Sequence, residues 1–109
     1  MELIDNAEVR KFHFQGNFQQ TLAGANQGLK NLEMWRLSVG PGNEIPANSH
    51  PGEVVALTLR GTGHIVVDGE QVDIRPDSTL VIPPGASRQV SNTGLEELVL
   101  LMIRGLTPA

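Results

Sequence analysis

The chain has 109 residues, enough for one hydrophobic core, and its eight basic and twelve acidic residues form no basic cluster. This argues against a nucleic-acid-binding surface, which needs grouped Lys and Arg, and the lack of cysteine excludes disulfides, thiolate catalysis and Cys-ligated metal sites. The N-terminus has neither the basic start nor the apolar run of a secretory signal, and no segment reaches the roughly 20 apolar residues of a membrane-spanning helix. We therefore expect a cytoplasmic protein with no nucleic-acid or membrane partner.

Short runs rich in Val, Ile, Leu and Thr are separated by the twelve glycines and seven prolines of the chain. This pattern is typical of strands joined by turns, and several such strands at short spacing indicate a sandwich or a barrel. We therefore predict an all-β fold. The predicted strands cover residues 9–14, 18–21, 33–39, 53–60, 65–67, 71–74, 79–82, 88–91 and 98–103.

Two connections can be predicted in more detail. Only residues 23–32 could form a helix, and the two Gly and two Asn in this segment favour a loop. The pair Asp68-Gly69 between two predicted strands indicates a hairpin, because a type I′ turn needs a positive φ at both central residues.

The strand at residues 53–60 is apolar on both faces. By alternation one face carries Val54, Ala56 and Thr58, and the other carries Val55, Leu57 and Leu59. A strand of this kind is covered on both sides, by a lumen on one side and by a second layer or a partner subunit on the other. If Val54, Ala56 and Thr58 line the lumen, their small size leaves room for a ligand of modest size.

Two blocks of sequence resemble the paired motifs of the cupin superfamily, in particular of its small single-domain members. The first runs from Gly42 to Val54 and ends at Gly61 and Gly63, and the second runs from residues 76 to 85 and is followed by Arg88 and Asn92. The family pattern is Gly, five residues, His-x-His, three or four residues, Glu, six residues and Gly, and then Pro-x-Gly, two residues, His, three residues and Asn. The scaffold positions match at Gly42, Pro51, Gly61, Gly63, Asp77, Pro83, Gly85 and Asn92, and with the flanking strands the resemblance covers about residues 33–103.

The resemblance implies a double-stranded β-helix, the jelly-roll barrel of the cupins, and a homodimer. It implies one domain, with a cupin barrel at residues 33–105 and N-terminal strands and a loop at residues 1–32 that complete the barrel or the dimer. The pocket is then expected between the sheets, near His50 and Arg88. One of Met34 and Trp35 should face this lumen, and the sequence does not say which.

Most metal ligands of the family are missing. At the four positions that hold a divalent ion in a typical cupin, this chain has Asn48, His50, Val54 and Arg88. Glu53 lies one position before the ligand position and should face away from the lumen unless a bulge turns it inward. A guanidinium about 4 Å from a divalent ion costs on the order of 8 kcal/mol at an effective dielectric near 20. We expect no cofactor, and if a metal binds, its ligands would be His50, Glu53 and Asn48.

Two functions remain open for the polar residues of the pocket. In the first, Arg88 holds an anionic or polar ligand in a binding protein, with hydrogen bonds from Asn48 and His50 and with Val54, Ala56 and Thr58 on the wall. In the second, the chain is an isomerase, cyclase, lyase or dioxygenase, with His50 moving a proton or holding a metal together with Glu53. Structural alternatives also remain open: a salt bridge of Arg88 with Glu53 or Glu44, exposure of Arg88 at the barrel mouth, and a hydrogen-bonded, inert His50.

Overall fold

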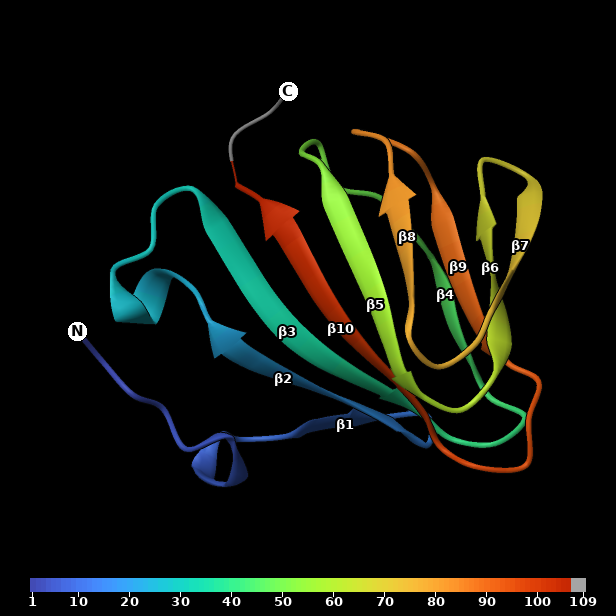
Figure 1. Ribbon diagram of the computed structural model, residues 1–109, viewed down its shortest axis with the longest axis horizontal. Coiled ribbons are helices and arrows are strands. Elements are labelled where there is room, and N and C mark those ends of the chain that lie inside the picture. Colours follow the sequence, from blue (N-terminus) through green and yellow to red (C-terminus); the bar gives the residue numbers. More distant parts are fainter. Residues whose placement is uncertain (107–109) are drawn as a thin grey trace.

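The computed structural model describes residues 1–106, which form two antiparallel sheets packed face to face (Figure 1). The strands are β1 (Phe12–Phe14), β2 (Asn17–Ala23), β3 (Leu32–Val39), β4 (Glu44–Asn48), β5 (Val54–Arg60), β6 (Gly63–Val67), β7 (Glu70–Ile74), β8 (Ser78–Ile82), β9 (Arg88–Asn92) and β10 (Leu98–Gly105). One sheet has the order β1-β2-β3-β10-β5-β8 and the other has the order β4-β9-β6-β7. The prediction of an all-β jelly-roll barrel is confirmed.

Two short 3₁₀ helices complete the described elements, η1 (Asn6–Glu8) and η2 (Ala25–Gln27). The second lies in the segment predicted as a loop. Within residues 1–106, no helix is long and apolar enough to cross a membrane. The turn at Asp68 and Gly69 has φ values of 46° and 83°, as the type I′ prediction requires.

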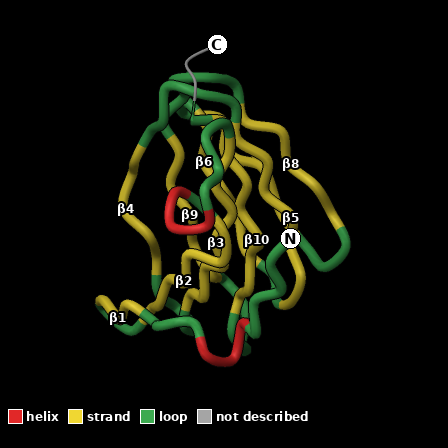
Figure 2. Tube along the Cα trace, turned by 90° about the vertical axis from the view of Figure 1, so that its left-hand side faces the viewer, coloured by secondary structure: helices red, strands yellow, loops and turns green. Residues whose placement is uncertain are grey.

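The sequence prediction misses strand β4, which carries Pro46. Proline lacks the N–H that a central strand would donate, and it is tolerated in a strand at the edge of a sheet or at a bulge. Both conditions hold here, because β4 is an edge strand and its pairing with β9 shifts register between Ile45 and Asn48. In Figure 2 the edge strand β4 of one sheet and the edge strand β8 of the other lie on opposite sides of the view.

Strand β1 begins at Phe12, later than the predicted start at residue 9. The N–H of Val9 donates to the carbonyl of Asn6 and closes the η1 turn. The carbonyls of Asn6 and Val9 in turn accept hydrogen bonds from the buried amide of Gln20. The backbone before Phe12 is therefore bound by a side chain of β2 instead of by a neighbouring strand.

Alternation along the central strands separates the core from the outer surface. The inward residues of β5, which are Val54, Ala56 and Thr58, are fully buried, whereas Val55 and Leu57 are half-buried and Leu59 is exposed. The core cluster contains Trp35, Leu37, Val39, Val54, Ala56, Ile65, Ile74, Ile82, Ala86, Val90, Leu98, Leu100 and Met102. Both faces of β5 are apolar as predicted, and part of the outer face is open.

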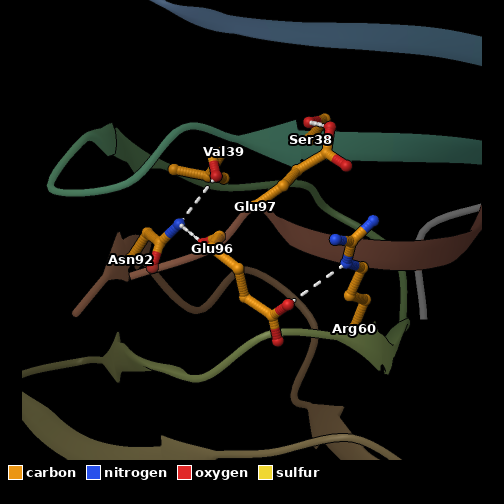
Figure 3. A network of polar contacts seen from close by, with 6 residues as sticks. All are labelled: Ser38, Val39, Arg60, Asn92, Glu96 and Glu97. Carbon is orange, nitrogen blue, oxygen red and sulfur yellow. Dashed lines mark hydrogen bonds and ion pairs between the residues drawn. The ribbon is translucent and has the colours of Figure 1, made fainter. Parts of the chain in front are cut away.

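A buried asparagine connects the two sheets at the end of β9 (Figure 3). The Asn92 amide nitrogen donates to the carbonyls of Val39 and Glu96, each at 2.8 Å, and its oxygen accepts from the N–H of Gly94 at 2.9 Å. Close to it, Glu96 forms an exposed ion pair with Arg60, and Ser38 donates to the carboxylate of Glu97. Asn92 is thus a structural residue of the turn between β9 and β10.

We expect the substitution Asn92→Ala to lower the free energy of unfolding by about 2 to 4 kcal/mol, because it leaves buried backbone groups without a partner. Urea denaturation followed by circular dichroism measures this loss. The exposed Asn26→Ala variant is the control, with an expected change within about 0.5 kcal/mol. Equal stability of the two variants would contradict the role assigned to Asn92.

Candidate functional site

A cavity of about 150 Å³ lies between the two sheets and opens to solvent. Its wall combines apolar side chains with two arginines, one glutamate and one histidine. It is lined by Gln19, Glu33, Trp35, Leu37, Ile45, Pro46, Asn48, His50, Arg88, Val90, Met102 and Arg104. These residues come from β2, β3, β4, β9 and β10 and from the segment after β4.

Strands β3 and β10 build one wall in successive layers. Leu37 pairs with Leu100, Trp35 pairs with Met102, and Glu33 pairs with Arg104. Side chains at directly paired positions lie on the same face of a sheet. The wall therefore changes from apolar in the barrel interior to charged at the end of the strands, where Glu33 and Arg104 meet.

Strands β4 and β9 build the opposite wall with the same order of layers. Ile45 pairs with Val90, and Asn48 pairs with Arg88 after the bulge. The apolar pair is again deeper, because Val90 is two residues closer to Asn92 and the bottom of the barrel. Each wall thus carries an arginine just above its apolar layer, Arg88 on β9 and Arg104 on β10.

Arg88 is buried, with 6% of its surface exposed. Its Nη1 atom has no hydrogen-bond partner within residues 1–106, and no ion pair with Glu53 or Glu44 occurs there. The carboxylate of Glu44 instead accepts a hydrogen bond from Gln89. Burial and, next, the charge of Arg104 lower the pKa of Arg88, but a guanidinium stays protonated in proteins. Arg88 therefore places an uncompensated positive charge beside the cavity.

His50 is held by Arg104. The Nη1 atom of Arg104 lies 2.7 Å from Nδ1 of His50, and its Nε lies 3.4 Å from a carboxylate oxygen of Glu33. A guanidinium can only donate, so Nδ1 must accept and the proton of the neutral ring is on Nε2. The edge-on contact with Trp35, whose ring centroid is 5.8 Å away, fixes the ring further.

The surroundings of His50 favour its neutral form. Partial burial and then the positive charges of Arg88 and Arg104 lower the pKa of His50, whereas the carboxylate of Glu33 acts in the opposite direction. With a neutral imidazole, the cavity contains two guanidinium groups and one carboxylate. Its formal charge is then +1, which favours an anionic ligand.

The structure brings together some of the residues singled out in the sequence and separates others. Asn48, His50 and Arg88 line the cavity, with Asn48 exposed at its edge. Of the pair Met34 and Trp35, it is Trp35 that faces the cavity. The remaining residues lie elsewhere. Three of them, Val54, Ala56 and Thr58, are fully buried but absent from the cavity wall, because β10 with Met102 lies between β5 and the cavity. Glu53 is exposed and also lies outside the wall.

Arg104, Glu33 and Gln19 line the cavity but were missed in the sequence. The sequence contained a signal for Arg104 and Glu33. One face of the last strand carries Leu98, Leu100, Met102 and Arg104 by alternation, and Glu33 shares a face with Trp35 because it lies two residues before it. Their position at the cavity depends on the register of β3 against β10. That register cannot be read from either strand alone.

The donors required for a cupin metal site are not assembled here. Within the described part of the chain, no group of three or more His, Asp or Glu residues is placed to hold a metal ion. Of the four family positions, only His50 is a good ligand, and its Nδ1 is already bonded to Arg104. Two guanidinium groups also line the same cavity and would repel a cation.

Comparisons with known proteins agree with this architecture. The family model described as "Cupin domain" matches residues 35–104. The chain belongs to the cupin family. It is 33% identical over 103 residues to auxin-binding protein 1 of Arabidopsis thaliana, an alignment that covers 85% of this chain and 52% of the plant protein. The chain thus spans about half the length of the curated relatives it matches.

Two solved structures share this fold with the chain. The polyketide cyclase RemF from Streptomyces resistomycificus superposes with a TM-score of 0.86 at 16% identity, over 99% of this chain and 81% of that one. A predicted oxalate decarboxylase from Thermotoga maritima superposes with a TM-score of 0.86 at 18% identity, over 97% of this chain and 100% of that one. At these identities the likeness concerns the fold alone.

The lowered pKa of His50 predicts a pH dependence of stability. Between the ordinary histidine value of about 6.5 and the lower folded value, the unfolded cupin binds more protons than the folded one, so stability falls as the pH decreases. The contribution of His50 to the change of the free energy of unfolding with pH cannot exceed about 1.4 kcal/mol per pH unit, the limit for one proton. It stays below this limit because solvent screens the half-buried ring. We expect His50→Gln to lose less stability than the wild type between pH 7 and pH 5, measured by urea denaturation.

The exposed His13→Gln variant is the control for this experiment and should keep the wild-type slope. A His50→Gln variant with the same pH dependence as the wild type would show that the imidazole is not held neutral.

Proposed function

We propose that this cupin domain binds a small carboxylate in a metal-free cavity, with Arg88 as the anchor. The observation that carries the proposal is the Nη1 atom of Arg88, buried beside the cavity and without a partner in residues 1–106. An unpaired buried charge costs several kcal/mol, and a carboxylate can accept two parallel hydrogen bonds from a guanidinium. Such an anion would also neutralise the formal charge of +1 in the cavity.

His50 and Asn48 are suited to donate hydrogen bonds to the same ligand. Arg104 bonds to Nδ1 of His50, so the Nε2–H group remains available as a donor. The oxygen of Asn48 accepts from the N–H of Ser49 at 2.8 Å, which leaves its amide nitrogen free to donate. In this arrangement the imidazole has no nitrogen free to accept a proton. We therefore assign His50 a binding role in preference to that of a general base.

The comparisons support small-molecule binding and also define the alternative. The curated relatives are named auxin-binding proteins, and structural neighbours are named as a cyclase and a decarboxylase. An enzyme of isomerase, cyclase, lyase or dioxygenase type would need a proton acceptor or a metal in the cavity. Glu53, the carboxylate that would join His50 and Asn48 as a metal ligand, is exposed and outside the wall. The donor geometry thus favours the binding function.

The variant Arg88→Met tests the proposed function with two readouts. Titration calorimetry with a panel of small carboxylates should show binding to the wild type and affinity at least tenfold lower for the variant, since a charge-assisted hydrogen bond is lost. Without ligand, the variant should be more stable by on the order of 1 kcal/mol, because an unpaired buried charge is replaced by an apolar side chain of similar length. Urea denaturation measures the second effect.

Arg75→Met is the matched control, because Arg75 is exposed and outside the cavity. It should change neither binding nor stability. Elemental analysis of the same wild-type sample should find substoichiometric metal. The proposed function fails if no carboxylate binds, if Arg88→Met binds carboxylates as tightly as the wild type, or if binding requires a stoichiometric metal ion.

We also propose that the domain is a homodimer that uses the outer face of the six-stranded sheet. Val81, Val55 and Ile103 form one cross-strand row on this face. Val81 is 69% exposed and Ile103 is 38% exposed, and Leu59, four residues along β5 from Val55, is 47% exposed. A continuous apolar surface of this kind is typical of an interface, and a face that meets its own copy gives a closed two-fold assembly.

The substitution Val81→Lys should weaken this dimer at least tenfold, because it places a positive charge at the most exposed position of the apolar row. Sedimentation equilibrium gives the dissociation constants of the wild type and the variant. Gln71→Lys adds the same charge to β7 in the other sheet and should leave the mass unchanged. A monomeric wild type, or a Val81→Lys variant that dimerises normally, would refute the interface.

A further inference from the structure

The size of the cavity limits how much of a ligand it can enclose. Its volume is about 150 Å³. An engineered protein cavity of about this size accommodates one benzene molecule, whereas pockets for drug-sized ligands measure about 300 to 1,000 Å³. The barrel can therefore enclose about six non-hydrogen atoms.

The charges of the wall limit the ligand to one negative group. Glu33 offsets one of the two guanidinium groups, since it pairs with Arg104 at 3.4 Å. Of these two guanidinium groups, Arg88 has no ion pair within residues 1–106. A second carboxylate on the ligand would meet Glu33 at the rim or the apolar layer below Arg88.

The layer below the two arginines fits an alkyl group. Leu37, Met102 and Val90 form it together with Ile45 and Trp35. The polar side chain at this level is the neutral amide of Gln19, which pairs with Leu37 from β2. An amide supplies no charge for a second anionic group, while the remaining surface gains from burying methylene groups.

On the basis of the proposed function, the structure assigns the ligand to one chemical class: a short aliphatic monocarboxylate with about two to four carbons. Its carboxylate binds Arg88 and the donors of His50 and Asn48, and its alkyl end occupies the space between Leu37, Val90 and Met102. This ligand is smaller than an aromatic acid and carries one charge fewer than a dicarboxylate.

A chain-length series tests the assignment on the wild-type domain by titration calorimetry. From acetate through propionate to butyrate, the dissociation constant should fall about fourfold per methylene, the factor that corresponds to about 0.8 kcal/mol of buried CH₂. The gain should end at butyrate, which has as many non-hydrogen atoms as the cavity can enclose, and hexanoate should bind more weakly. Succinate and the auxin indole-3-acetate should each bind at least tenfold more weakly than butyrate.

A cavity-enlarging variant gives an independent readout. Val90→Ala should shift the preferred chain length upward by one methylene, because Val90 lines the cavity. Val54→Ala removes the same volume from the core outside the cavity wall and should leave the preference unchanged. Circular dichroism confirms that both variants are folded.

The outcomes separate this inference from the proposed function. If no carboxylate binds, the proposed function fails and the assignment fails with it. If carboxylates bind through Arg88 but the affinity keeps rising through hexanoate, or if succinate or indole-3-acetate binds as tightly as butyrate, the function stands and the short-chain assignment is wrong.

Discussion

Strands β3 and β10 pair without interruption from Leu98 to Gly105, and this register determines the contents of the barrel. Because side chains alternate strictly along a strand, a shift by one residue would move every inward group of β10 to the outer surface. The observed register places Met102 opposite Trp35 and Arg104 opposite Glu33. The apolar base of the cavity and its charged rim therefore arise from a single pairing, which also delivers Arg104 to the imidazole of His50.

The charges beside the cavity include one that lowers stability. Arg104 bonds to His50 and forms an ion pair with Glu33, although its Nε lacks a hydrogen-bond partner, whereas Arg88 forms no ion pair in residues 1–106 and its Nη1 has no hydrogen-bond partner there. A fold selected only for stability would pair this charge or replace it with an apolar side chain, since an unpaired buried charge costs several kcal/mol. Sites that bind or react often retain such unfavourable groups at the expense of stability. Arg88 is the residue of this domain that best fits that description.

The sequence allowed most of the fold to be predicted, because the information is local. Runs of Val, Ile, Leu and Thr between turn residues located nine of the ten strands, and the residue pair Asp68-Gly69 predicted a turn whose φ values are 46° and 83°. Gly63, a scaffold position of the motif, has a physical reason as well: a Cβ there would lie 2.1 Å from the carbonyl oxygen of Ser91. Strand β4 was missed because Pro46 is an edge-strand exception. The partnership of Arg104 with His50 was missed because it joins positions 54 residues apart, through a register that no local pattern specifies.

A guanidinium and a metal ion give a cavity different chemistry. A metal ion and an arginine both supply positive charge for a carboxylate, but a guanidinium binds it through directed hydrogen bonds and offers no coordination site at which a substrate could be polarised. At Arg88 the charge is fixed on a strand, and at His50 the donor from Arg104 occupies the nitrogen that would otherwise accept a proton. The fixed charge of Arg88 and the occupied Nδ1 atom of His50 act in the same direction. Under the proposed function, together they favour binding of an anion over proton transfer to His50.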